Sequence, residues 1–322
     1  MKRKQYIDIL NVIGLLGIVL AHVAPPVIVF QLRNFDVVLM ILVSAYLGLK
    51  SRKSEELMPY LIKRLVLPTW IFVSFFLLLK LCLGNFDLGF KGVLATFALS
   101  NYGIGYVWII RIYFIVAILI PLYKALKLYL NEVHVLLISL LLFVGYEFLC
   151  HVGVFNNKLL DYLIAYFIPC FLLLVLAKII FESEKWNNIT IMVSFLIFVV
   201  YAVYLYRENG YFIQTQEYKY PFQLYYLSYG ILVSSILIKL TKRVTLAGFL
   251  YDKVILFISS HSLWIYLWHI IPVTLLNHFG LAWYIKYVLV LIIASALTVC
   301  QSKIVEKLQG KVNPEVLNIF RG

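Results

Sequence analysis

Long apolar runs are the feature that most restricts how this chain can fold. The run "SLWIYLWHIIPVTLL" (262–276) contains no Lys, Arg, Asp or Glu, and several other runs are close to the roughly 17–25 residues that a helix needs to cross a bilayer. Backbone amides inside hydrocarbon must pair within their own segment, so each run is expected to be an α-helix. Composition agrees, because 63% of the 322 residues are hydrophobic and only 13% are charged, against about a quarter in soluble domains.

The runs and the helix breakers between them predict an all-α, polytopic membrane protein. One domain, 1–322, is expected to contain about ten transmembrane helices. The predicted spans are 6–24, 35–49, 65–84, 105–123, 133–150, 159–181, 189–206, 221–240, 254–277 and 281–301. Residues 85–104 are rich in Gly and Asn, so an interfacial or re-entrant element is expected there instead of a full span.

The distribution of the basic residues predicts an orientation. Most of the 28 Lys and Arg residues fall in loops on the same side as the N-terminus, and basic loops usually remain in the cytoplasm. Both termini are therefore predicted to be cytoplasmic. The same distribution assigns the net charge of +13 to contact with the lipid bilayer and not to a nucleic-acid partner.

Ionisable side chains are rare within membrane spans and usually face a cavity or one another, so those within or beside the predicted spans are candidate site residues. His22 lies in the first span, Arg111 in the fourth, and His269 about midway along the ninth. A guanidinium needs an anion or water, and Asp36 is ranked above Glu147 as its counter-ion. The alternatives are a packed His22 near the headgroups and an Arg111 that extends outward to the interface.

The first span carries a polar stripe. Asn11 and His22 are eleven residues apart, which is about three turns at 3.6 residues per turn, so both lie on one helix face. Asp8 falls within about 40° of that face. The stripe is therefore expected to run about 20 Å from the cytoplasmic end toward the outer half of the helix.

A second polar line is predicted around His269. Ser262, Tyr266 and His269 follow one another at i, i+4 and i+7 and so share one helix face. A buried neutral imidazole can remove a proton from a hydroxyl and return it to a leaving group, and an arginine can hold a developing oxyanion. These groups suit acyl transfer to an alcohol, and they suit proton-coupled transport equally well.

Several stretches together resemble the integral-membrane acyltransferase-3 family, bacterial enzymes that O-acylate cell-surface glycans and related acceptors. They are "YIDILNVIGLLGIVLAHV", "RNFDVVLMILVSAYLG", "YLIKRLVLPTW", "GYVWIIRIYFIVAILIPLY" and "SHSLWIYLWHIIPV". Their order and spacing cover nearly the whole chain. Three positions depart from the family pattern. Asn11 replaces a basic residue, Leu61 replaces one of the paired arginines so that only Arg64 remains, and Ala45 replaces the Gly of "LSGYL".

The resemblance implies an O-acyltransferase, most simply an O-acetyltransferase, in the bacterial cytoplasmic membrane. The donor would be cytoplasmic acetyl-CoA or another acyl-CoA, and the acceptor a hydroxyl of a cell-surface or lipid-linked glycan. The predicted donor-binding residues are Asp8, Asn11, Lys63 and Arg64, the last two within the densest basic patch (Lys50, Arg52, Lys53, Lys63 and Arg64). No permanently bound cofactor and no metal are expected, and the four single cysteines lack metal-ligand spacing.

The resemblance also assigns roles to the polar residues inside the bundle. His22 would be the general base, or would carry the acyl group transiently. Arg111 and Asp36 would hold transition-state charge or orient His22, and His269 would support it or act as a second base. The side chains expected to line the substrate cavity are Ser44, Trp108, Ser262 and Tyr266.

Two other functions fit the same residues. A polysaccharide exporter or flippase, or another inner-membrane transporter, would use the polar stripe as a path. A non-catalytic scaffold of a polymer-synthesis complex is favoured only by the missing basic residue at Asn11.

Overall fold

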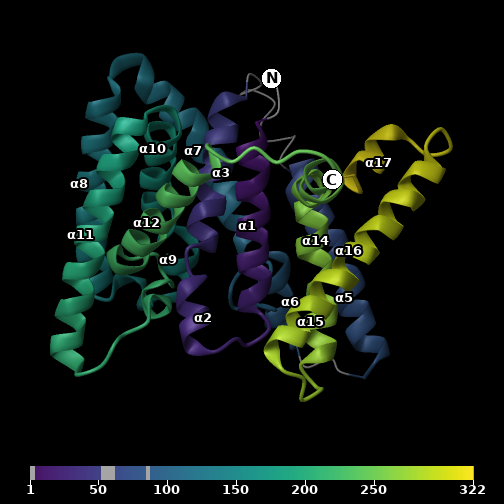
Figure 1. The fold of residues 1–322 in the computed structure, drawn as a ribbon. Helices are drawn as coiled ribbons and strands as arrows, with labels where there is room; N and C mark the ends of the chain where they lie inside the picture. The colour runs from purple at the N-terminus through teal and green to yellow at the C-terminus, as the bar shows by residue number, and fades with distance from the viewer. Residues whose placement is uncertain (1–3, 52–61, 85–87, 322) are drawn as a thin grey trace. The chain divides into compact units, whose positions relative to one another are not determined.

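The computed structural model describes residues 4–51, 62–84 and 88–321 (Figure 1). These residues form helices joined by turns, and within the described ranges there is no β-strand, only an isolated bridge between Gln309 and Val312. The chain separates into two compact units. Unit 1 comprises Met1–Ile18, Pro26–Ser54 and Ile115–Leu246, and unit 2 comprises Val19–Pro25, Glu55–Phe114 and Ala247–Gly322.

Most helices belong to one unit, whereas α1 and α7 carry residues of both. The helices with residues in unit 1 are α1 (Gln5–Ala21), α2 (Val27–Leu32), α3 (Asp36–Lys50), α7 (Trp108–Tyr129), α8 (Glu132–His151), η2 (Val154–Asn156), α9 (Lys158–Leu163), α10 (Phe167–Glu182), α11 (Glu184–Asn209), η3 (Thr215–Tyr218) and α12 (Leu224–Thr241). Those of unit 2 are η1 (Ile62–Val66), α5 (Leu67–Cys82), α6 (Phe90–Phe97), η4 (Leu250–Ile255), α13 (Leu256–Ser260), α14 (Ser262–Trp268), α15 (Ile270–Leu276), α16 (Trp283–Leu308) and α17 (Pro314–Ile319).

The core of unit 1 is built around α10. This helix is apolar on all sides and packs against α3, α8 and α11, while α12 fills the space between α3 and α11. A helix without a polar face is stable only where it is surrounded by protein or lipid. For α10 the surroundings are protein, because side chains from Pro169 through Val175 are buried almost without interruption.

Unit 2 is held together by aromatic contacts around α14. The helices α14 and α15 both pack against α16. Phe72 of α5 lies edge-on to the Trp268 ring with 5.6 Å between centroids, and the Trp268 indole N–H donates to Gln301 at 2.7 Å. Trp264 stacks on Phe320 at 5.8 Å, which ties the end of the described chain to α14.

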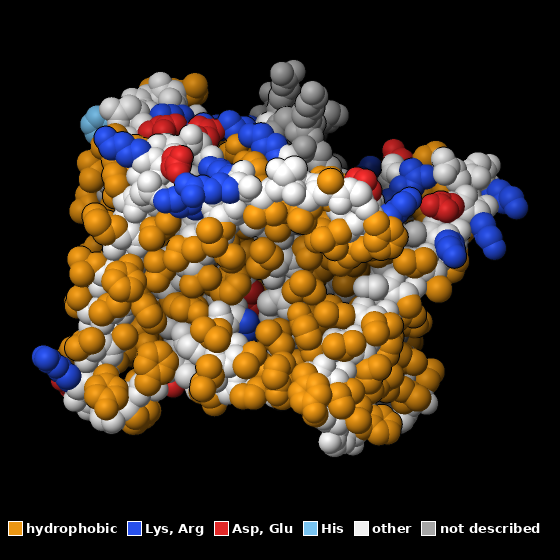
Figure 2. Space-filling model, in the orientation of Figure 1, with side chains coloured by type: hydrophobic (Ala, Val, Ile, Leu, Met, Phe, Trp, Pro, Cys, Tyr) orange, Lys and Arg blue, Asp and Glu red, His pale blue; other side chains and the backbone are white. Residues whose placement is uncertain are grey.

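The side chains exposed on the surface of these helices indicate whether water or lipid surrounds the protein. Only 11% of the apolar 18-residue stretch of α11 is buried inside the protein. The hydrophobic side chains of this helix therefore point outward. Hydrophobic side chains cover the middle of the helices in view, and most Lys and Arg side chains lie near helix ends (Figure 2). Because exposed apolar area of this extent is unfavourable in water, the chain is a membrane protein.

The structure confirms the all-α class and most of the predicted spans. Among the described residues, eight helices are long and apolar enough to cross a membrane, and up to nine if one bent pair is a single span. That pair, Leu250–Ser260 and Ser262–Leu276, is bent by 68° within the predicted span 254–277. With 17 residues, α1 falls short of the 18 residues that each of the eight candidate spans reaches. The count of about ten and the cytoplasmic termini stay predictions. Within 85–104 the described part holds only the eight-residue α6.

Close helix contact in unit 1 depends on glycine. A Cβ atom added at Gly230 of α12 would lie 2.5 Å from Cγ2 and 2.8 Å from Cβ of Val38 on α3. A β-branched valine cannot rotate away from such a contact within a helix. The α3–α12 contact therefore requires a residue without a side chain at this position.

We expect Gly230→Ala to lower the free energy of unfolding by about 1–3 kcal/mol, because the added methyl group overfills this contact. Thermal unfolding of the purified protein in detergent would measure it. The matched control is Gly145→Ala on α8, where an added Cβ meets nothing within 4 Å and the helix propensity of Ala should raise stability by about 0.5–1 kcal/mol. Equal effects of the two substitutions would show that the α3–α12 contact is looser than described.

Candidate active site

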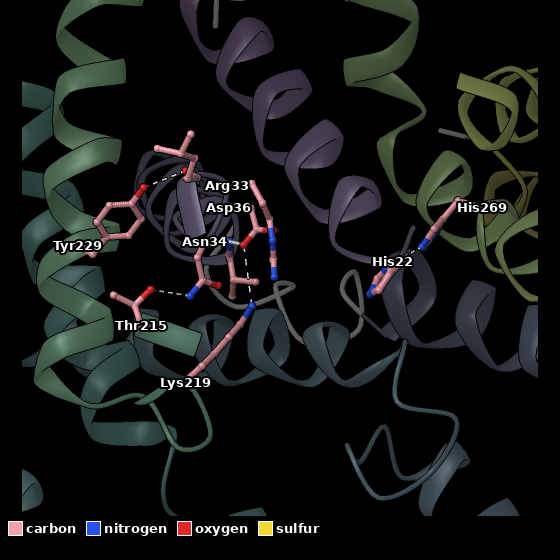
Figure 3. Close-up of polar contacts among 10 residues, drawn as sticks. His22, Arg33, Asn34, Asp36, Thr215, Lys219, Tyr229 and His269 are labelled. Atoms are coloured by element: carbon pink, nitrogen blue, oxygen red, sulfur yellow. Dashed lines mark hydrogen bonds and ion pairs between the residues drawn. The ribbon is translucent and has the colours of Figure 1, made fainter. Parts of the chain in front are cut away.

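The two histidines of the predicted spans meet in unit 2. His22 Nδ1 lies 2.9 Å from His269 Nε2, a hydrogen-bond distance (Figure 3). The ring planes are 18° apart and the ring centroids 5.0 Å apart. His269 is fully buried, with 0% of its surface exposed, whereas His22 is half-buried. The contact joins residues 247 positions apart in the chain.

The backbone around each histidine explains why the side chains can meet. His22 follows the last residue of α1, and the helix ends there because Pro25 and Pro26 follow and disfavour helical geometry before them. His269 lies between α14 and α15. Pro272 lacks the N–H that would bond the carbonyl of Trp268, so the helix is interrupted just where His269 stands.

The hydrogen bonds of His269 fix the positions of the protons in a neutral pair. Its Nδ1 contacts the backbone carbonyl oxygen of Tyr266, which can only accept, so Nδ1 carries the hydrogen. In a neutral imidazole the other nitrogen then has the lone pair, and His269 Nε2 accepts from His22 Nδ1. The basic lone pair of His22 consequently lies on Nε2.

Tyr106 packs against both imidazoles. Its ring lies edge-on to His22 at 4.9 Å and to His269 at 6.3 Å between centroids. The hydroxyl of Tyr266 donates to the backbone carbonyl of Tyr106, which secures the position of the segment before α7. These contacts hold the two histidine rings in place and make the pair a rigid unit with one basic nitrogen.

Asp36 stands at the start of α3 in a separate polar cluster of unit 1 (Figure 3). Its Oδ2 accepts from Arg33 Nη1 at 2.8 Å, and its Oδ1 accepts from the backbone N–H of Val37 at 2.7 Å. Lys219 Nζ lies 3.9 Å from Oδ1. All three charged side chains are at most 5% exposed. The carboxylate is therefore the centre of a buried ion-pair network.

Asn34 connects this network to the segment around η3. Its side-chain amide donates to Thr215 Oγ1 at 2.8 Å, and Thr215 N–H and Oγ1 both donate to Gln31 Oε1, at 3.0 and 3.2 Å. The Tyr229 hydroxyl of α12 donates to the carbonyl of Leu32 at 2.9 Å. Side chains from α2, α3, η3 and α12 thus form one polar cluster.

The other predicted site residues are divided between the two units. In unit 1, Asp8 is buried and Asn11 and Ser44 are half-buried. In unit 2, Trp108, Arg111 and Tyr266 are buried, Ser262 is half-buried, and Lys63 and Arg64 are exposed. The roles given to these residues stay predictions. Arg52 and Lys53 of the basic patch lie outside the described residues.

The structure shows specific contacts for two of these residues, Lys63 and Tyr266. Lys63 forms an exposed ion pair with Glu315 of α17 at 3.0 Å. The predicted line from Ser262 through Tyr266 to His269 contains a real contact, but the group that reaches His269 is the backbone carbonyl of Tyr266 and not its hydroxyl.

Sequence reasoning missed the residues that surround these two clusters. The sequence predicts that Lys219 and Arg33 are solvent-exposed charges in loops outside the membrane, but both side chains are buried. Asn34 and Thr215 belong to polar or mixed segments with no periodicity, and Tyr106 lies at the start of the predicted span 105–123. One signal was available, since Arg33 and Asp36 stand three residues apart with opposite charge next to a predicted span.

Apolar helices together with a hydrogen-bonded imidazole pair define a helical membrane protein with ionisable side chains packed against one another. The comparison with known families then gives the particular class: the chain belongs to the acyltransferase domain family, which it matches over residues 4–305. It is therefore an acyltransferase, which confirms the resemblance found in the sequence. No curated protein and no solved structure matches the chain.

The pKa of Lys219 is lowered to about 8, mainly by burial; the attraction of Asp36 opposes this shift and the repulsion of Arg33 adds to it. Its pKa in the unfolded chain is about 10.5, so the folded protein binds fewer protons between the two values and stability rises with pH there. We expect this lysine to contribute a rise of up to about 3 kcal/mol in the free energy of unfolding between pH 8 and pH 10.5.

Thermal unfolding of the wild type and Lys219→Met from pH 7 to pH 10 would measure this rise. It should be absent from Lys219→Met and retained in Lys185→Met, which removes an exposed lysine of the same unit. Parallel pH profiles for the wild type and Lys219→Met would contradict the assignment.

Proposed function

We propose that this acyltransferase transfers an acyl group, most simply acetyl, from cytoplasmic acyl-CoA to a hydroxyl of a glycan outside the bacterial cytoplasmic membrane, with His22 as the general base. The observation that carries the proposal is the hydrogen bond between His22 and His269, which directs the basic lone pair of His22 to Nε2. The family supplies the reaction class, and the glycan acceptor comes from the sequence resemblance.

In the proposed reaction the acceptor hydroxyl gives its proton to His22 Nε2 as its oxygen attacks the thioester carbonyl. The C–S bond of the tetrahedral intermediate then breaks, and the proton passes from His22 to the departing thiolate, so that the ester and free coenzyme A leave. The lone pair of His269 accepts the Nδ1–H throughout and stabilises His22 while it is positively charged.

Arg111 is the proposed partner of the developing oxyanion. It belongs to the same unit as both histidines and is buried in the first turn of α7. A guanidinium keeps its charge at every physiological pH and can donate to an oxyanion without losing a proton.

The proposed donor route begins at basic residues of the cytoplasmic mouth. Lys63 and Arg64 are exposed on η1, where their positive charges would attract the phosphates of coenzyme A. Asp8 and Asn11 lie on α1 and would contact the donor farther along the polar stripe of that helix. The salt bridge of Lys63 to Glu315 is exposed, so the phosphates of coenzyme A would replace it at little cost.

We expect His22→Ala to remain folded in the membrane and to lower the rate of acyl transfer about 10²–10⁴-fold, which is the usual contribution of a general base. The measurement is mass spectrometry of the surface polysaccharide from a deletion strain complemented with each variant. The glycan should be lighter by one acyl unit per modified residue, and that mass would also distinguish acetyl from succinyl.

The matched control is His278→Ala, which removes an exposed histidine of the same unit and should leave acylation normal. Membrane insertion of both variants is checked by immunoblot of the membrane fraction. A normal acyl content in the His22→Ala strain would show that another group is the base.

A further inference from the structure

The polar cluster of unit 1 contains more positive than negative charge. Arg33 and Lys219 both pair with Asp36, so two cations share one carboxylate when Lys219 is protonated. The three side chains are 5%, 3% and 0% exposed, in that order. Asp36 thus carries one negative charge against the two positive charges that pair with it, and an added anion would help to balance the charges of such a buried network.

The same cluster contains buried polar atoms without a hydrogen-bond partner among the described residues. They are Arg33 Nε, Gln31 Nε2, Asn34 Oδ1, Gln216 Oε1 and the Tyr226 hydroxyl. Two of these side chains are held by other hydrogen bonds, because Asn34 donates to Thr215 and Gln31 accepts from it. Folded proteins leave few such atoms unpaired, so a group of five in one cluster requires an explanation.

Shared contacts place these atoms around the ion pairs. Lys219 Nζ lies 5.6 Å from the Tyr226 ring centroid and 5.7 Å from that of Tyr220. Asp36, Arg33 and Lys219 point toward one another in Figure 3, with Asn34 beside them. The cluster therefore presents an excess positive charge together with donors, such as Arg33 Nε, and acceptors, such as Asn34 Oδ1.

We infer that the cluster of Arg33, Asn34, Asp36, Lys219 and Tyr226 binds the anionic group of a sugar ligand, a carboxylate or a phosphate. The anion would balance the excess charge and accept from Arg33 and Tyr226. The amide groups of Asn34 and Gln31 would bind neighbouring hydroxyls, which both accept and donate.

The further identification of this ligand as the acceptor, an acidic glycan, rests on the proposed function. Arg33 and Lys219 both belong to loops that the basic-residue distribution assigns to the outside, which is the side where the acceptor would bind. Anion binding itself requires no acyl transfer, so the two claims fail separately.

A purely structural cluster is the competing explanation. In that case the ion pairs only attach η3 to the start of α3, and added anionic sugars have no specific effect. The test must therefore measure binding and not activity.

The experiment uses the full-length protein in detergent and follows its thermal unfolding with added glucuronate, glucose 1-phosphate or glucose, at constant ionic strength. We expect at least one anionic sugar to raise the unfolding temperature in a saturable way, and glucose to have a much smaller effect. A response to glucuronate alone indicates a carboxylate ligand, and one to glucose 1-phosphate alone indicates a phosphate ligand. Equal shifts with all three sugars, or no shift, would overturn the inference.

Variants locate the binding. Lys219→Met should weaken binding of the anionic sugar at least tenfold, Lys219→Arg should largely restore it, and Lys185→Met should bind as the wild type does. If Lys219→Met does not unfold cooperatively, Tyr226→Phe provides the same test, because it removes only a hydroxyl and should weaken binding severalfold. Unchanged binding in the variant tested would contradict the assigned site.

If an anionic sugar binds but no strain acylates its glycan, the proposed function fails and the anion site stands. If the glycan loses its acyl group with His22→Ala and no anionic sugar binds, the proposed function stands and the anion site fails.

Discussion

The hydrogen bond between His22 and His269 is the interaction on which the account of this acyltransferase depends. An imidazole enclosed by apolar helices needs a partner for each ring nitrogen, since an unpaired polar group is costly where water is excluded. His269 finds one partner in the carbonyl of Tyr266 and the other in His22. His22 directly follows the end of α1, and His269 lies between α14 and α15, where Pro272 removes one helical hydrogen bond.

The direction of these hydrogen bonds determines which nitrogen of the histidine pair is basic. A carbonyl at one end can only accept, so each donor along the chain is determined in turn, and the last basic nitrogen is that of His22. In the proposed mechanism His269 would have the role that a carboxylate has beside the histidine of many hydrolases, which is to orient the base and stabilise its charged form. Neutral His269 achieves this without a buried negative charge.

Much of this arrangement could be predicted from the sequence, for physical reasons that differ between residues. Apolar runs determine helices in a membrane almost uniquely, so the helix positions followed from hydropathy. His22 and His269 stood out because ionisable groups at that depth are rare. Burial of Lys219 could not be predicted, because a lysine in a short loop reads as a solvated charge until the fold encloses it.

The interruption of the helix at His269 could be predicted only in part from the sequence. Pro272 could be read directly, but the choice of the carbonyl of Tyr266 as the partner depends on the side-chain conformation that His269 adopts in the folded protein. Tyr106 offered no signal at all, because an aromatic residue before a membrane helix is most often an interfacial anchor. Its contact with both imidazoles follows from tertiary packing alone.

In the proposed mechanism the two polar clusters would have different tasks. The histidine pair of unit 2 would supply the acid–base group, and the cationic cluster of unit 1 would recognise a charged, hydroxyl-rich molecule. Such a division would let acceptor specificity change without disturbing the base, because each cluster is held by its own hydrogen bonds.

The most direct measurement of the central claim is a double-mutant cycle on kcat/KM for acyl transfer with His22→Ala, His269→Leu and the double variant. If His269 acts only through His22, the double variant should be about as slow as His22→Ala alone, since residues that act as a unit are strongly non-additive. Independent effects that multiply in the double variant would contradict the account, and so would wild-type activity in His269→Leu.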